Sequence, residues 1–127
     1  MYNPQSTPPR QTERSLLELE SEIGELSAHL DAATCRLLLC VAEYDRREGW
    51  ASGGFRSCAH WLAWRVGLDL GAARERLRVG HALERLPQTC AAFAGGQVSY
   101  SKVRALARVA TVETEEQLLE VARHGTA

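Results

Sequence analysis

The chain has 127 residues, enough for one domain, and its hydrophobic share of 45% is ordinary for a globular protein. It contains no apolar run near the ~20 residues that cross a bilayer and no N-terminal pattern of a secretory signal, so we expect a cytoplasmic protein without a membrane partner. The net charge is -1, but residues 1–45 sum to -5, residues 46–108 to +7 and residues 109–127 to -3, which concentrates the basic character in the middle.

The first predicted element is a long helix from Ser15 to Arg47. Residues 1–12 carry prolines among polar residues, and we expect them to form a disordered tail before a single helical domain over residues 13–127. Ser15 and Glu18 have the spacing of a capping box, and Gly49 follows the predicted end. The apolar seam of this helix has alternating spacings of three and four: Leu16, Leu19, Ile23, Leu26, Leu30, Ala33, Leu37, Cys40 and Tyr44.

The two halves of this helix are expected to have different roles. Leu38 and Val41 widen the apolar stripe in the second half, so the part after Leu30 is expected to lie in the core. The first half is flanked by glutamates, and we expect it to pair with another helix, from this chain or from a second copy. Its pairing candidates are Leu16, Leu19, Ile23, Leu26 and Leu30. Ordinary packing of the whole seam within the chain remains an open alternative.

Five shorter helices are predicted after the long one. Capping residues and helix stops place them at about residues 57–67, 69–86, 87–94, 99–110 and 114–125. Trp61 and Trp64 are expected to anchor the first of these helices against the long one. Nothing in the chain shows the period-two alternation of a strand, so the expected fold class is all-α, with the long N-terminal helix packed against about five shorter ones.

The sequence shows no arrangement of residues typical of catalysis. We found no spacing typical of a nucleophile with its base, of paired carboxylates, of a metal cluster or of a phosphate-binding loop. The four cysteines contain no C-x-x-C pair, and we interpret each of them as a small buried apolar residue. We therefore expect no catalytic residue, no metal ligand, no cofactor and no small-molecule substrate.

Nucleic-acid binding is the favoured hypothesis from the residues. The segment from Pro87 to Ala110 has the helix, glycine turn and helix of a DNA-reading pair, with phosphate contacts from basic side chains and base-edge contacts from Tyr100 or Ser101. The candidate residues are Arg74, Arg78, Tyr100, Ser101, Lys102, Arg104 and Arg108. An overall pI near 6.4 is low for a DNA-binding domain, and the acidic first helix offers internal partners for the arginines. The alternative that the basic face is only solvated and contacts no DNA therefore remains open.

A family resemblance rests on the order of several short motifs. They are Tyr44 to Trp50, Trp61-Leu62-Ala63, Gly67-Leu68, Ala72-Ala73-Arg74, Ala82 to Pro87, Gly96 to Lys102 and Ala105-Leu106-Ala107. Over about residues 16–125 the chain resembles the domain of unknown function 222, which is abundant in actinobacteria and commonly precedes an HNH endonuclease domain.

The resemblance implies an all-helical accessory domain that holds DNA for a nuclease, here the N-terminal part of a longer architecture. The HNH motif is absent, so no catalytic residue is carried over. The alternative is a protein-interaction or dimerisation module without DNA contact.

Overall fold

The computed structural model describes residues 13–124 of the chain, and all regular elements in this range are helical. Their bounds are α1 (Leu16–Arg46), η3 (Ala51–Gly53), α2 (Cys58–Val66), α3 (Leu70–Arg85), α4 (Pro87–Ala94), α5 (Tyr100–Val109) and α6 (Glu115–His124). The all-α fold class is thereby confirmed. The expected tail at residues 1–12 lies outside the described residues. No helix in the described range has the length and apolar character needed to span a bilayer.

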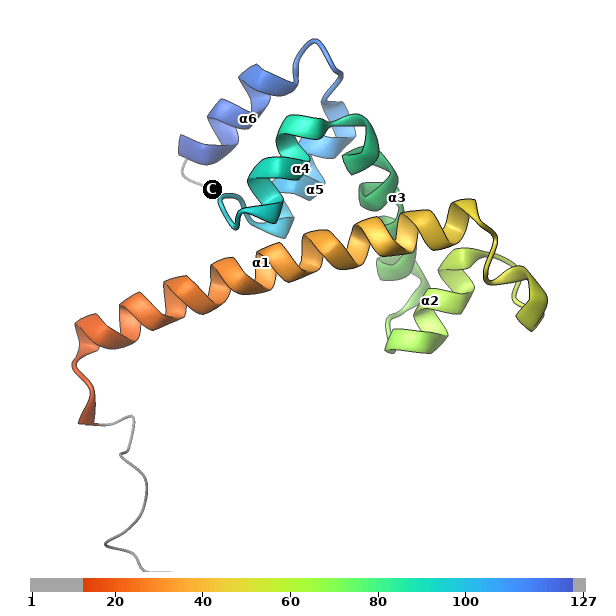
Figure 1. Ribbon diagram of the computed structural model, residues 1–127, viewed down its shortest axis with the longest axis horizontal. Helices are drawn as coiled ribbons and strands as arrows, with labels where there is room; N and C mark the ends of the chain where they lie inside the picture. Colours follow the sequence, from red (N-terminus) through yellow and green to blue (C-terminus); the bar gives the residue numbers. More distant parts are fainter. Residues whose placement is uncertain (1–12, 125–127) are drawn as a thin grey trace, which may run out of the picture.

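Helix α1 sets the layout of the molecule. It begins with the predicted capping box, in which the Glu18 amide donates to Ser15 Oγ at 3.0 Å and the Ser15 amide donates to Glu18 Oε1 at 2.9 Å. In Figure 1, α4, α5 and α6 lie on one side of α1, α3 crosses α1, and α2 lies on the other side near the C-terminal end of α1. The N-terminal half of α1 projects beyond the other helices. The projecting half therefore has no partner helix among the described residues.

The core consists of two hydrophobic clusters. The larger cluster joins the second half of α1 to α3 through α6, with Leu38, Leu83 and Phe93 among its fully buried side chains. The smaller cluster lies between α1, α2 and α3, and its buried members are Val41, Cys58, Ala59, Leu62 and Ala73. Helices α1 and α3 contribute to both clusters, so they hold the two parts together.

The core-facing side of α1 differs from the predicted one. We expected the part of α1 after Leu30 to lie in the core, and this is confirmed for Leu38 and Val41, which are buried. It is wrong for the seam itself, since Leu37 is 44% exposed and Ala33 and Cys40 are exposed as well, as is Leu30 at 69%. The buried face consists of Cys35, Leu38, Val41 and Ala42. The reason lies in how closely α3 approaches, since a Cβ added to Gly80 would lie 2.5 Å from the Leu38 carbonyl oxygen. Small side chains allow such an approach, so the face richest in leucine is the uncovered one.

The anchoring prediction for the two tryptophans is confirmed for Trp61 and wrong for Trp64. The Trp61 ring packs against Tyr44 of α1 with centroids 4.2 Å apart. Trp64 is 68% exposed and contacts Phe55 at 5.4 Å between centroids. The two residues are three apart on a nine-residue helix, so they point in directions that differ by about 60°. Only one of them can face α1 squarely.

Helix α4 begins without a capping side chain of its own. Its N-cap residue is Leu86, and the capping acceptor comes instead from α6, where Glu115 Oε2 accepts the Thr89 amide at 2.5 Å. Glu115 is only 1% exposed. A carboxylate at a helix N-terminus is stabilised by the helix dipole and by the free amides there. Glu115 thus ties α6 to α4 across the larger cluster.

Candidate nucleic-acid interface

Helices α3 and α5 bring three of the predicted arginines together around one carboxylate. Glu75 of α3 accepts from Arg78 on the same helix, from Arg104 Nε at 2.9 Å and from Arg108 Nη2 at 2.5 Å, the last two on α5. Arg78 also donates to the Arg104 carbonyl oxygen at 3.3 Å. We call Glu75, Arg76, Arg78, Arg104 and Arg108 the arginine cluster.

The electrostatics of the arginine cluster leave it positive. Hydrogen bonds from Arg78 and Arg104 lower the pKa of Glu75 to about 2, so its carboxylate is charged throughout the physiological range. Three guanidinium groups share this single negative charge. The side chains of Arg104 and Arg108 remain 50% and 57% exposed, so they keep donors turned toward solvent.

Tyr100, at the start of α5, packs against its neighbours and does not project into solvent. Its ring stacks on Phe93 at 6.4 Å between centroids, and the guanidinium of Arg76 lies 4.8 Å from its centre. The Tyr100 amide donates to Asp31 Oδ1 of α1 at 3.3 Å, and burial raises the pKa of the Tyr100 hydroxyl. Of the two residues that we assigned to base edges, only Ser101 is exposed.

The remaining candidates lie apart from the arginine cluster. Lys102 Nζ donates to the Ala122 carbonyl oxygen at 2.9 Å, near the end of α6. Because residues two apart on a helix differ by about 200° in direction, Lys102 faces away from Arg104. Arg74 is exposed on α3, one turn before Arg78. The structure therefore splits the predicted basic set into a cluster at α3 and α5 and a lysine bound to α6.

Two members of the arginine cluster were not among the predicted residues. The alternative left open by the sequence was pairing of the arginines with acidic groups of the first helix, whereas Glu75 of α3 pairs with Arg78, Arg104 and Arg108. The spacing of Glu75 and Arg78, three residues apart on a helix, favours an ion pair and was a signal in the sequence. The contacts from α5 had no such signal, because they depend on how α3 and α5 pack.

A family model described as Domain of unknown function (DUF222) matches residues 18–127. The chain belongs to this family. The resemblance inferred from the motif order is thus confirmed, and the arginine cluster lies within the matched range of the DUF222 domain. Neither the curated proteins nor the solved structures gave a significant match.

The described part of the DUF222 domain has few other features that resemble a chemical site. Within residues 13–124, no three His, Cys, Asp or Glu side chains gather in a way that could hold a metal ion. A surface depression next to the arginine cluster is lined by Asp69, Gly71, Ala72, Glu75, Arg76, Tyr100 and Arg104. Its charged lining consists of two guanidinium groups, from Arg76 and Arg104, and two carboxylates, from Asp69 and Glu75.

Proposed function

We propose that this DUF222 domain is a non-catalytic nucleic-acid-binding accessory module that contacts phosphates through the arginine cluster. The supporting observation is the convergence of Arg78, Arg104 and Arg108 on the single carboxylate of Glu75. This arrangement leaves an excess of positive charge on one surface of a chain whose overall charge is near zero. The resemblance to domains that precede HNH endonucleases supplies the context, in which another module carries out cleavage.

Arginine suits this role because its planar guanidinium can bind a phosphate through two parallel hydrogen bonds. Arg104 and Arg108 are four residues apart on α5 and therefore point from the same face, about 6 Å apart along the helix. Adjacent phosphates on one strand are separated by a similar distance. Contacts of this kind carry no base specificity, so we propose general binding to the backbone of DNA.

Reversing the charge at Arg104 and Arg108 tests the proposal. The double variant Arg104→Glu/Arg108→Glu should bind labelled duplex DNA at least about tenfold more weakly at low salt, with a shallower dependence of affinity on salt. Fluorescence anisotropy across a salt series measures both quantities. The variant Arg56→Glu/Arg65→Glu carries the same change of net charge on exposed residues near α2 and serves as the matched control. Equal affinity of both variants would contradict the proposal.

Lys102 and Arg74 stay candidates that single variants can separate from the cluster. Lys102→Glu should weaken DNA binding less than Arg104→Glu, because its ammonium group already bonds to the Ala122 carbonyl oxygen. Arg74→Glu should fall between them, since Arg74 is exposed and lies beside Arg78 on α3. The affinities of both single variants are measured by fluorescence anisotropy across the same salt series.

Removing the charge of Glu75 should have the opposite effect on DNA binding. In the variant Glu75→Gln the carboxylate no longer competes with phosphates for the three arginines, so affinity should rise about tenfold at low salt. Glu84→Gln removes the same charge from a carboxylate paired with Arg46 at the far end of α3 and is the control. Unchanged affinity for Glu75→Gln would show that the cluster does not contact the phosphates.

A further inference from the structure

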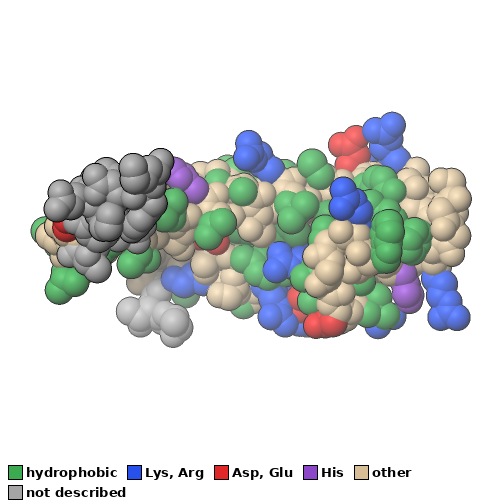
Figure 2. Space-filling model, turned by 90° about the horizontal axis from the view of Figure 1, so that it is seen from below, with side chains coloured by type: hydrophobic (Ala, Val, Ile, Leu, Met, Phe, Trp, Pro, Cys, Tyr) green, Lys and Arg blue, Asp and Glu red, His purple; other side chains and the backbone are tan. Residues whose placement is uncertain are grey.

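A long apolar stripe runs along the uncovered side of α1. We call Leu16, Leu19, Ile23, Leu26, Leu30, Ala33, Leu37 and Cys40 the α1 stripe. Leu16 is 77% exposed, Ile23 66% and Leu26 52%, and the face of the molecule seen in Figure 2 shows hydrophobic side chains along its length. Over 24 residues the stripe extends about 36 Å. A row of exposed apolar side chains of this length is typical of an interaction surface.

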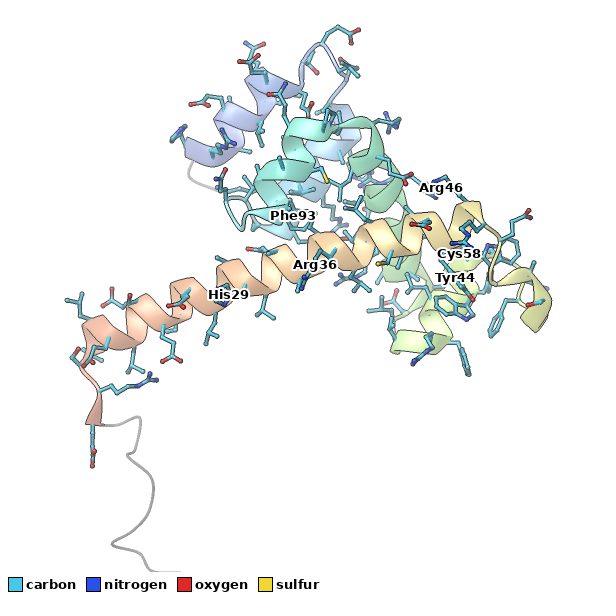
Figure 3. All side chains as sticks on the ribbon, viewed as in Figure 1. His29, Arg36, Tyr44, Arg46, Cys58 and Phe93 are labelled. Atoms are coloured by element: carbon cyan, nitrogen blue, oxygen red, sulfur yellow. The ribbon has the colours of Figure 1, made fainter. Side chains whose placement is uncertain are left out.

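The α1 stripe lies nearly opposite the face that packs on α3 to α6. Successive residues of a helix turn by about 100°, which places Cys35, Leu38 and Ala42 on one side and Leu30 and Leu37 on the other. His29 and Arg36 flank the stripe and lie on the edge of α1 away from α4 and α5 (Figure 3). A second helix can therefore lie along the stripe from Leu16 to Cys40 without meeting α4 or α5. Helix α2, whose Trp61 packs on Tyr44, bounds the stripe at its C-terminal end.

We propose that a second copy of this chain covers the α1 stripe, with the two α1 helices antiparallel and the two-fold axis crossing the stripe midway between Leu26 and Leu30. This point is level with Ala28, whose own side chain faces Gly96 on the other side of α1. The stripe has the three-four spacing of a coiled-coil seam, so a partner with the same spacing can interlock with it over its whole length. This proposal is independent of the nucleic-acid contact, because it involves a different face of the chain.

Side-chain sizes favour the antiparallel alignment. With the axis midway between Leu26 and Leu30, Leu16 faces the partner's Cys40, Ile23 faces the partner's Ala33, and Leu26 faces the partner's Leu30. Each small residue is then matched by a large one. In a parallel alignment Ala33 would face its own copy, as would Cys40, and two layers of small side chains would leave gaps in the seam.

Charge complementarity favours the same alignment. Glu22 precedes one seam position and Arg36 precedes another, so antiparallel helices bring Glu22 beside the partner's Arg36, twice by symmetry. Within its own chain Glu22 pairs with Arg14. Arg14 precedes α1 and is therefore farther than Glu22 from the middle of the stripe. A parallel alignment would instead place the two acidic halves side by side, each with Glu18, Glu20, Glu22 and Glu25.

A surface depression marks the place where the partner's helix would begin. Cys40, Glu43, Tyr44, Arg47 and Gly49 line this depression at the C-terminal end of the stripe. In the antiparallel alignment the partner's Leu16 comes to this end. Its side chain would contact the exposed edge of the Tyr44 ring and the Cys40 thiol, which extends the seam to the end of α1.

Disulfide trapping on the full chain tests the alignment. In the variant Leu16→Cys, mild oxidation should give a covalent dimer in which position 16 is joined to the partner's Cys40, mapped by mass spectrometry of peptides. Cys40 is exposed, whereas Cys35 and Cys58 are buried. Links between position 16 and its own copy would show a parallel pair, and a light-scattering mass of a monomer at all concentrations would exclude self-association. Either result overturns the proposal.

A series of charge-swap variants independently tests whether a second copy of the chain covers the α1 stripe. Glu22→Arg and Arg36→Glu should each raise the dimer dissociation constant about tenfold, and the double variant should recover most of the loss. Ile23→Ser/Leu26→Ser should raise it at least about 100-fold, because four apolar side chains leave the interface. Circular dichroism checks that helicity is kept, and Arg14→Ala is the control for the intrachain pair. Dimer mass unchanged by the serine variant would overturn the proposal.

Discussion

Replacing Gly80 by alanine is expected to lower the free energy of unfolding by about 2–3 kcal/mol, as overpacking of a tight core does. A Cβ at this position would lie 2.5 Å from the Leu38 carbonyl oxygen and 3.3 Å from its carbon, so backbone and not a flexible side chain stands in the way. Either α1 or α3 must move, and the larger hydrophobic cluster lies between them. Denaturant unfolding followed by circular dichroism measures the change.

Gly24 provides the matched control for this substitution. It also lies inside a long helix, but a Cβ there would meet no atom within 4 Å. Alanine is favoured over glycine in an open helix by about 1 kcal/mol, so Gly24→Ala should raise stability while Gly80→Ala lowers it. If both variants were more stable than the parent chain, the close contact of α1 with α3 would be wrong.

Replacing Glu115 by alanine is expected to lower the free energy of unfolding by about 2–4 kcal/mol, because a buried amide loses its charged acceptor and a cavity remains. The Thr89 amide donates to Glu115 at 2.5 Å, and the buried Thr89 hydroxyl has no hydrogen-bond partner among the described residues. Among the described residues, Glu115 is the side-chain acceptor recorded for this helix start, whose N-cap residue Leu86 provides none. Thermal or denaturant unfolding measures the loss.

Two further variants separate the charge of Glu115 from its position. Glu115→Gln keeps the shape and one acceptor oxygen, so it should recover part of the stability that alanine loses. Glu116→Ala removes the neighbouring carboxylate, which is exposed, and should change stability by less than about 0.5 kcal/mol. Equal small effects at both positions would show that Glu115 does not cap α4.

Helix boundaries could be predicted from the sequence because their causes are local. Ser99 accepts the Lys102 amide at the start of α5, and Pro87 stands at the start of α4, as its fixed backbone angle favours. The last helix, predicted to begin at about residue 114, is the weaker case. The Thr114 hydroxyl bonds to Thr111, and the first residue of α6, Glu115, is buried in the core. There a tertiary contact outweighs the local signal.

The face of α1 that enters the core could not be predicted in the same way. A count of apolar residues favours the leucine seam, while the observed core face includes Cys35 and Ala42, which are small. Their advantage is visible only when Gly80 is placed against α1. The arginine cluster shows a similar limit, because periodicity identified Arg104 and Arg108 as an outer stripe but contained nothing on their shared contact with Glu75.

The division of the core into two clusters bears on how the native state fluctuates. The smaller cluster has five buried side chains, three of them from α2, whereas the larger one joins parts of five helices. The free energy of opening a segment grows with the apolar contacts that it must break. Helix α2 can thus detach and reform while α3 to α6 stay assembled, so amide protons of α2 exchange through small local openings and those of α5 only through larger ones.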